Sequence, residues 1–190
     1  MRLVTLFLFI STLSFGQGFS PSYQGALLKF NTSVPELSQS FYFNGVQFKV
    51  IDQSSNFAGG LAVQYYTQDH RQNIDSFGLL GDLYYRIGRR LVQPYIGVSL
   101  GVQKMRFYGS YLPAVRQSTM GPYLGDIVCA NIAPTVGVRY LVYEDDISEI
   151  DFFVQASRGL QIYSRESGSL EGTKAGTQSY FNVGVIFMGL

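Results

Sequence analysis

Long stretches of strict alternation constrain the fold of this chain more than any other feature of its sequence. In residues 94–103, PYIGVSLGVQ, apolar residues alternate with glycine and with small or polar residues. A period of two is typical of an extended strand whose two faces meet different surroundings. Related segments occur at 23–33, 40–51, 56–67, 76–87, 93–107, 127–142, 149–163 and 179–189. All eight reach the ~9–11 residues that a tilted strand needs to cross a bilayer, whereas soluble strands cluster near ~5–6.

The composition of the two faces indicates which one points outward. Charged residues make up 14% of the chain, well below the share in ordinary soluble domains. The more polar face is rich in Gly, Ser, Ala, Gln and Tyr, and such side chains suit the narrow interior of an eight-stranded barrel. We therefore expect an all-β, eight-stranded antiparallel up-and-down transmembrane β-barrel, with a packed polar interior. The residues expected to face lipid are Ile96, Val98, Leu100, Val136, Val138, Val183 and Val185.

Five charged residues fall on the face that is expected to line the interior. Their charges nearly balance, and buried charges are tolerated when they pair with one another. We therefore predict a polar network across the interior, formed by Lys49, Asp82, Arg86, Arg139 and Asp151.

The predicted connections differ in length at the two ends of the barrel. Segments 52–56, 88–92 and 143–149 are short, whereas 68–75, 108–126 and 164–178 are longer; the short segment 35–40 is the exception. Short turns at one end and long loops at the other are typical of outer-membrane barrels. Aromatic residues near strand ends are expected to form girdles at the membrane surfaces: Tyr85, Tyr95, Tyr140, Tyr163 and Phe181.

The N-terminal segment has the features of a secretory signal peptide. Arg2 precedes an apolar run over 3–15, and Ser14 and Gly16 fit a cleavage site between small residues. The run is shorter than the ~20 residues of a spanning helix. We expect a signal peptide at 1–16 and a barrel domain at 17–190.

Together with these features, the stretches PYIGVSLGV, PTVGVRYLVY and YFNVGVIFMGL resemble the small outer-membrane β-barrels of the OmpA/OmpX-like "porin family" type. The resemblance implies export to the outer membrane, contact with outer-membrane lipid, and assembly by the barrel-insertion machinery. It implies no single activity, because such barrels serve as structural elements, adhesins, receptors and occasionally enzymes. We expect a structural role or a surface-interaction role through extracellular loops; an extracellular ligand or protein is a candidate partner whose identity the sequence does not give. In such proteins the last strand usually ends in an aromatic residue, whereas here MGL follows Phe187.

Two other functions remain open from the sequence. His70, the single histidine, lies near Asp69, Asp75 and Ser76, which is compatible with an enzyme that modifies envelope lipid, although no G-x-S-x-G motif is present. A soluble secreted barrel that binds a hydrophobic ligand is the second alternative. A narrow conducting pore is a lesser option.

No cofactor or metal site is expected. The chain has one histidine and one cysteine, Cys129, which is interpreted as a packing residue. A formal net charge of +1 gives no basic surface for nucleic acid. The candidate surface loops contain His70, Tyr111 and Tyr123, and segment 108–126 is long and rich in aromatic residues.

Overall fold

The computed structural model describes residues 17–31, 40–54, 56–68, 74–88, 91–108, 123–170 and 174–189. They form eight strands and one short 3₁₀ helix, η2 (Gly168–Leu170). The strands are β1 (Gln17–Asn31), β2 (Ser40–Ser54), β3 (Phe57–Gln68), β4 (Ile74–Arg86), β5 (Val92–Tyr108), β6 (Tyr123–Glu144), β7 (Ser148–Glu166) and β8 (Lys174–Gly189). Within these ranges there is no helix long and apolar enough to span a membrane.

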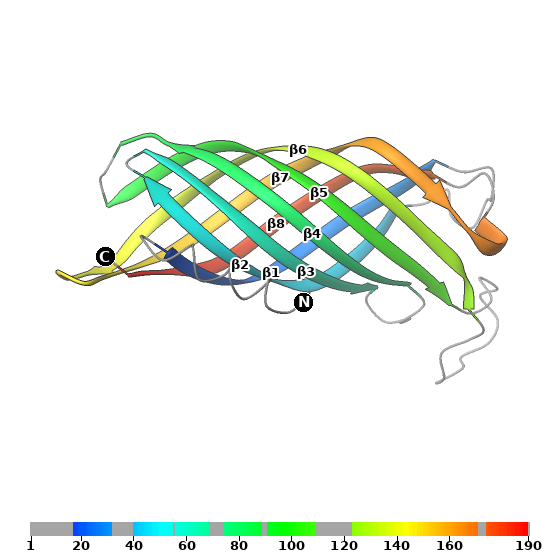
Figure 1. Ribbon diagram of the computed structural model, residues 1–190, viewed down its shortest axis with the longest axis horizontal. Coiled ribbons are helices and arrows are strands. Elements are labelled where there is room, and N and C mark those ends of the chain that lie inside the picture. The colour runs from blue at the N-terminus through cyan, green and yellow to red at the C-terminus, as the bar shows by residue number, and fades with distance from the viewer. Residues whose placement is uncertain are drawn as a thin grey trace, which may run out of the picture.

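The strands close into one barrel in sequence order, as Figure 1 shows. Each strand pairs antiparallel with its neighbour in the chain, and β1 pairs with β8, for example Phe19 with Phe187. Closure leaves no sheet edge with unpaired backbone groups, which hydrocarbon would not satisfy. The predicted eight-stranded antiparallel barrel is thus confirmed.

Several strands are longer than the sequence pattern predicts. β1 begins at Gln17 rather than 23, β6 begins at Tyr123 rather than 127, and β8 begins at Lys174 rather than 179. In β6 and β8 backbone pairing therefore continues into segments predicted as loops, and in β1 it continues to the first residue of the predicted barrel domain. The apolar alternation did not reveal these extensions because strand pairing needs only backbone groups. Register shifts at 107/108, opposite the start of β6, and at 28/30, opposite the start of β8, also interrupt the period of two.

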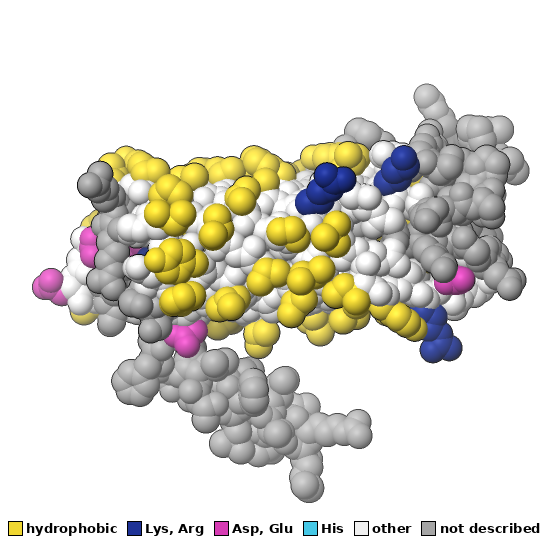
Figure 2. All heavy atoms as spheres, turned by 90° about the horizontal axis from the view of Figure 1, so that it is seen from above, with side chains coloured by type: hydrophobic (Ala, Val, Ile, Leu, Met, Phe, Trp, Pro, Cys, Tyr) yellow, Lys and Arg dark blue, Asp and Glu magenta, His cyan; other side chains and the backbone are white. Residues whose placement is uncertain are grey.

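We call the end with connections 55–56, 87–91 and 145–147 the turn end, and the opposite end the loop end. The outward faces of all eight strands carry an apolar belt, one side of which is seen in Figure 2. The belt comprises Phe19, Tyr23, Leu27, Val46, Phe48, Val50, Phe57, Leu61, Val63, Tyr65, Phe77, Leu79, Leu83, Tyr85, Ile96, Leu100, Val102, Val136, Val138, Tyr140, Phe152, Leu160, Phe181 and Phe187, all exposed. Figure 2 also shows basic side chains toward the right-hand end of the belt.

The prediction that Tyr95 belongs to an aromatic girdle is wrong. Its side chain is 5% exposed and points inward, because it shares the face of Gln93 and Ser99 on β5. Phe181 does face outward, but it pairs with Ala156 and Gly25 near the middle of β8 rather than at its end. Tyr85, Tyr140 and Tyr163 are exposed.

The interior is polar only in part, so the expectation of a wholly polar interior needs correction. Near the loop end it is filled by an apolar plug: Ala26, Leu28, Phe30, Phe41, Phe43, Tyr66, Ile74, Met105, Phe107, Ile127, Cys129, Leu170 and Tyr180. Leu170 comes from η2, which lies in the β7–β8 connection. The middle of the barrel holds amide and hydroxyl side chains, and the turn end holds the charged residues together with a second apolar cluster.

Interior glycines make room for large rings on neighbouring strands. Gly97 on β5 pairs with Tyr84 on β4, and a Cβ at residue 97 would collide with the Tyr84 ring and with the Leu83 carbonyl oxygen. Gly137 on β6 stands in the same relation to Tyr95 on β5. The glycines of the alternating stretches therefore allow the interior to be filled to close packing.

Candidate functional site

The charged residues of the interior form what we call the turn-end ion cluster: Lys49, Asp82, Arg86, Arg139, Glu149 and Asp151. They come from β2, β4, β6 and β7, and each is at most 9% exposed. Alternation puts them on the inner face, and the barrel brings together residues that are far apart in the chain.

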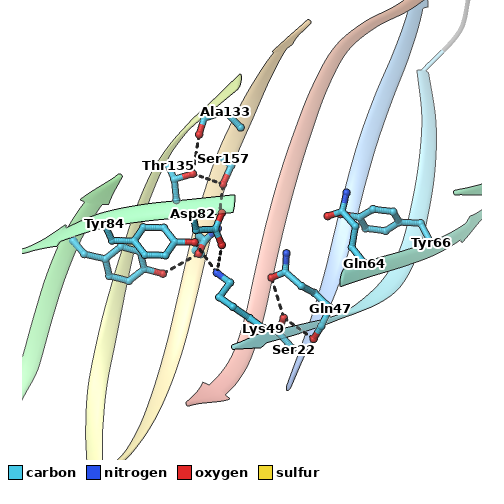
Figure 3. A network of polar contacts seen from close by, with 12 residues as sticks. Ser22, Gln47, Lys49, Gln64, Tyr66, Asp82, Tyr84, Ala133, Thr135 and Ser157 are labelled. Carbon is cyan, nitrogen blue, oxygen red and sulfur yellow. Dashed lines mark hydrogen bonds and ion pairs between the residues drawn. The ribbon is translucent and has the colours of Figure 1, made fainter. Parts of the chain in front are cut away.

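The first part of the cluster centres on Lys49. Its Nζ lies 2.5 Å from a carboxylate oxygen of Asp82 and donates to the Tyr84 hydroxyl at 2.6 Å, as Figure 3 shows. The same Nζ lies 4.8 Å from the centre of the Tyr84 ring. A buried ammonium is thus held by a carboxylate, a hydroxyl and an aromatic ring, which together replace the water it has lost.

The second part centres on Arg139. Its guanidinium pairs with Asp151 and lies 3.7 Å from a carboxylate oxygen of Glu149. It also donates to the Gln53 side-chain oxygen at 2.7 Å. Arg86 donates to the Gln93 side-chain oxygen at 3.1 Å.

Above the ion cluster, toward the loop end, lies a layer of neutral polar side chains. Gln103 donates to the Ser76 hydroxyl at 2.6 Å, and Asn131 donates to the Gln178 side-chain oxygen at 3.0 Å. The Tyr66 hydroxyl donates to Gln64, at 2.8 Å (Figure 3). The Asn131–Gln178 bond crosses the interior from β6 to β8, the Gln103–Ser76 bond joins the adjacent strands β5 and β4, and the Tyr66–Gln64 bond stays within β3. All three satisfy polar groups that are buried inside the barrel.

A hollow adjoins the ion cluster at the turn end. Its empty space is about 360 Å³, counting the part that is open to solvent, and its lining includes Lys49, Arg86, Arg139, Tyr84 and Tyr95. The charged members are held by neighbouring side chains within the barrel. The arrangement therefore serves structure: it neutralises charge inside a low-dielectric shell.

The structure places the five residues of the predicted interior network as follows. All five, Lys49, Asp82, Arg86, Arg139 and Asp151, are buried on the inner face, and two ion pairs join four of them. The fifth residue, Arg86, donates a hydrogen bond to the Gln93 side-chain oxygen. Ile96, Leu100, Val136 and Val138 are exposed on the outer face, and Val98, Val183 and Val185 are half-buried there.

The candidate loop residues receive little structural description. His70 and Tyr111 lie outside the described residues, and of Tyr123 only the backbone, which begins β6, is described. Cys129 is fully buried in the apolar plug. The described ranges contain no group of three or more His, Cys, Asp or Glu side chains that could hold a metal ion.

Sequence reasoning did not include Glu149 in the interior network, placed Tyr95 on the outer face, and did not predict the apolar plug. The plug could have been found by continuing the alternation of inward-facing residues to the ends of the strands. On β5 these residues run from Gln103 through Met105 to Phe107, and on β1 they run from Gln24 to Leu28 and Phe30.

Comparisons with known proteins bear on the fold. No protein-family model and no curated protein sequence matches the chain. Among solved structures, Neisserial surface protein A is similar at 12% identity and a TM-score of 0.59, covering 88% of this chain and 95% of that one. The attachment invasion locus protein Ail of Yersinia pestis matches at 10% identity and a TM-score of 0.42, covering 91% and 98%. The N-terminal β-barrel domain of Pseudomonas aeruginosa OprF matches at 13% identity and a TM-score of 0.40, covering 89% and 96%. The likeness to the neisserial protein shows a shared fold, and this chain accordingly has the fold of the small outer-membrane barrels that its sequence resembles.

Proposed function

We propose that the chain is an integral outer-membrane β-barrel with a structural or surface-interaction role, in which the barrel is the anchor and the loops form the exposed surface. The observation that carries the proposal is the sidedness of the barrel. Val136 on the outer wall is 59% exposed, whereas Gln64 and Arg139 inside are 2% and 4% exposed. A protein surrounded by water has the opposite arrangement.

The size of the apolar belt supports placement in a membrane. Monomeric soluble proteins rarely expose contiguous apolar patches larger than ~300–600 Å². The belt runs around all eight strands, and hydrocarbon is the surrounding that removes its contact with water. A soluble barrel that carries a hydrophobic ligand is disfavoured, because Phe43, Tyr66 and Phe107 are themselves fully buried in the loop-end interior.

The same plug argues against a conducting pore. Phe30 lies edge-on to both Phe41 and Phe107, each with a ring-centre distance of 5.5 Å, so rings from β1, β2 and β5 meet inside the barrel. We expect no stable single-channel conductance from the full chain in planar bilayers. Stable conductance would contradict a closed loop end.

Membrane placement and orientation can be tested in one set of variants. In a Cys129→Ser background, His70→Cys places a thiol in the β3–β4 connection and Asp146→Cys places one in the β6–β7 turn. The protein should fractionate with outer membranes and show heat-dependent gel mobility. An impermeant maleimide should label residue 70 on intact cells and residue 146 only after the envelope is opened.

Each result of this test has a definite meaning. Recovery of the wild-type chain in a soluble fraction without detergent would overturn the proposal as a whole. Labelling at residue 146 but not at residue 70 on intact cells would overturn the assignment of the loops to the outside. Cys129→Ser alone is the control, and it should not be labelled at any stage.

A further inference from the structure

Arg158 lies on the outer face of β7, inside the apolar belt. Its side chain is exposed. Phe152, which is exposed, lies on the turn-end side of Arg158 along the same strand. On the loop-end side, Leu160 and Ile162 are 54% and 65% exposed. A permanently charged guanidinium is therefore flanked on both sides by side chains that face lipid.

Other outward basic residues stand at the margin of the belt instead. On β5 the exposed apolar run ends at Val102, and Lys104 and Arg106 follow it toward the loop end. Lys104 is also neutralised, since its Nζ lies 2.6 Å from a carboxylate oxygen of Asp126. Lys104 thus provides an internal comparison for Arg158: a basic side chain on the same wall, with a partner and outside the belt.

Arg158 has no acidic partner within the described part of the chain. No hydrogen bond or ion pair joins its side chain to another described residue, and the outward residues beside it on β6 and β8 carry no carboxylate: Ile132, Pro134, Val136, Val138, Ser179 and Phe181. A charge inside a membrane is costly unless an anion or the polar surface layer receives it. The anion must therefore come from outside these strands.

Two further polar side chains lie beside Arg158 on the next strands. Arg158 pairs with Ser179 on β8, and Ser179 pairs with Leu27 on β1. Lys29 follows Leu27 by two residues, faces outward and is exposed. From the spacing of paired strands and the rise along them, the Cα atoms of Arg158 and Lys29 are about 12 Å apart. Their long side chains can converge on one group at the level of Ser179.

We propose that Arg158, Ser179 and Lys29 bind the phosphate of an anionic lipid in the leaflet that surrounds the loop end. A guanidinium presents a fork of donors that matches phosphate oxygens, and its aliphatic stem can lie along the apolar wall while its head reaches the headgroups. A second copy of this chain is disfavoured as the partner, because the outward residues of the belt provide no carboxylate to meet Arg158. The site rests on the proposed membrane placement.

The test compares lipid retention by variants of the full chain. The protein is folded in micelles containing equal amounts of phosphatidylglycerol and phosphatidylcholine, and native mass spectrometry gives the ratio of the two lipids that stay bound. Arg158→Leu should lower the retained ratio of phosphatidylglycerol to phosphatidylcholine about fivefold, the factor that corresponds to one basic residue near a lipid surface. Arg158→Lys should keep most of the preference. Lys104→Met, the matched control, should leave the ratio nearly unchanged because Asp126 already neutralises Lys104.

An unchanged ratio in Arg158→Leu would overturn the site, and so would an equal fall in Lys104→Met, since that would show a general charge effect. Flotation with vesicles and heat-dependent gel mobility are measured on the same samples. If the wild type fails both, the proposed membrane placement fails. If the wild type and Arg158→Leu pass both while the lipid ratio stays the same, only the phosphate site fails.

Discussion

The belt region and the loop end of the barrel differ in which side chains lie inside and outside: the belt region is apolar outside and polar inside, and the loop end is the reverse. In the belt region the outer wall is apolar, as at Leu100 and Val136, and the inner face holds polar side chains such as Gln47 and Gln64. At the loop end Phe43 and Phe107 fill the interior, and Lys29 and Arg106 are exposed outside. The same strands pass through both regions without a break.

This reversal fits the proposed membrane placement, in which the surrounding medium, rather than the strand itself, decides which face is apolar. β5 shows the change within one strand: Gln103 is inside beside outward Val102, and two residues later Met105 is inside between outward Lys104 and Arg106. The loop end follows the rule of soluble proteins, with apolar side chains buried and charges exposed, as expected if it lies beyond the lipid in the proposed placement.

The largest effect should come from a charge placed in the apolar plug. Phe43 is fully buried there, so Phe43→Asp would bury an unpaired carboxylate and should cost more than about 4–5 kcal/mol, enough to prevent folding. Ser40→Asp is the matched control. It adds the same charge at an exposed position of β2 that pairs with Lys29, and it should fold normally. Urea-dependent folding into vesicles measures both, and normal folding of Phe43→Asp would show that the loop-end interior is not a packed core.

A slightly smaller loss is expected from breaking the Lys49–Asp82 pair in the belt region. Asp82→Ala leaves the Lys49 ammonium buried with only the Tyr84 hydroxyl and ring, and should lower the free energy of unfolding by about 3–5 kcal/mol. The double variant Lys49→Met/Asp82→Leu should recover most of that loss, because two apolar residues replace the pair. If Asp82→Ala alone proved neutral, the pair would not be desolvated.

A charge on the outer wall should distinguish the two regions directly. Val136→Arg places a guanidinium in the belt and should cost about 2–4 kcal/mol. Thr67→Arg places the same group on the outer face of β3 at the loop end, opposite Asp75, and should stay within about 0.5 kcal/mol of the wild type. Equal costs for the two variants would mean that both positions meet the same medium.

The smallest effect concerns the turn end, where the β6–β7 connection lies outside the membrane in the proposed placement. The Asp145 carboxylate accepts hydrogen bonds from the Ile147 amide at 2.9 Å, the Tyr143 hydroxyl at 2.7 Å and the Ser148 amide at 2.7 Å. These bonds lower the pKa of Asp145 from 3.8 to about 2. Because the folded pKa is below the ordinary value, the turn is stabilised above about pH 4 and loses that stabilisation as the pH falls toward 2.

Amide chemical shifts of Ile147 and Ser148, followed from neutral to acid pH, should report this titration with a midpoint near 2. Asp145→Asn should abolish the acid transition while the barrel remains folded. A midpoint at the ordinary value for aspartate would show that the hydrogen bonds do not persist in solution.

The sequence predicted the barrel well because the main evidence for a barrel, alternation of apolar and polar residues, can be read within each segment separately. Alternation at Ile96, Val98 and Leu100 needs no knowledge of neighbouring strands, and eight such segments define both the strand number and the two faces. The scarcity of charge then favoured an apolar wall in lipid. Neither inference depends on how strands pair.

The features that the sequence did not predict depend on the position of each residue along the barrel axis, between the turn end and the loop end. The position of Tyr95 near the start of β5 predicts a girdle residue, whereas its alternation with Gln93, two residues earlier on the same face, puts its side chain inside. The plug residues lie on the same inner face as the polar residues of the interior. Phe107 and Gln103 differ only in their position along the barrel axis. Arg158 stands out only when its neighbours along β7 are known to face lipid.

The pairing of β1 with β8 has a consequence for assembly. Seven of the eight ladders join strands that follow one another in the chain, whereas this ladder joins the first strand to the last. Until β8 is in place, the backbone groups of β1 and β7 that will pair with β8 remain unpaired. These two strand edges can then pair with another polypeptide. Pairing of β8 with both β1 and β7 therefore completes the barrel, and a chain that lacks β8 has two unpaired strand edges instead of a closed sheet.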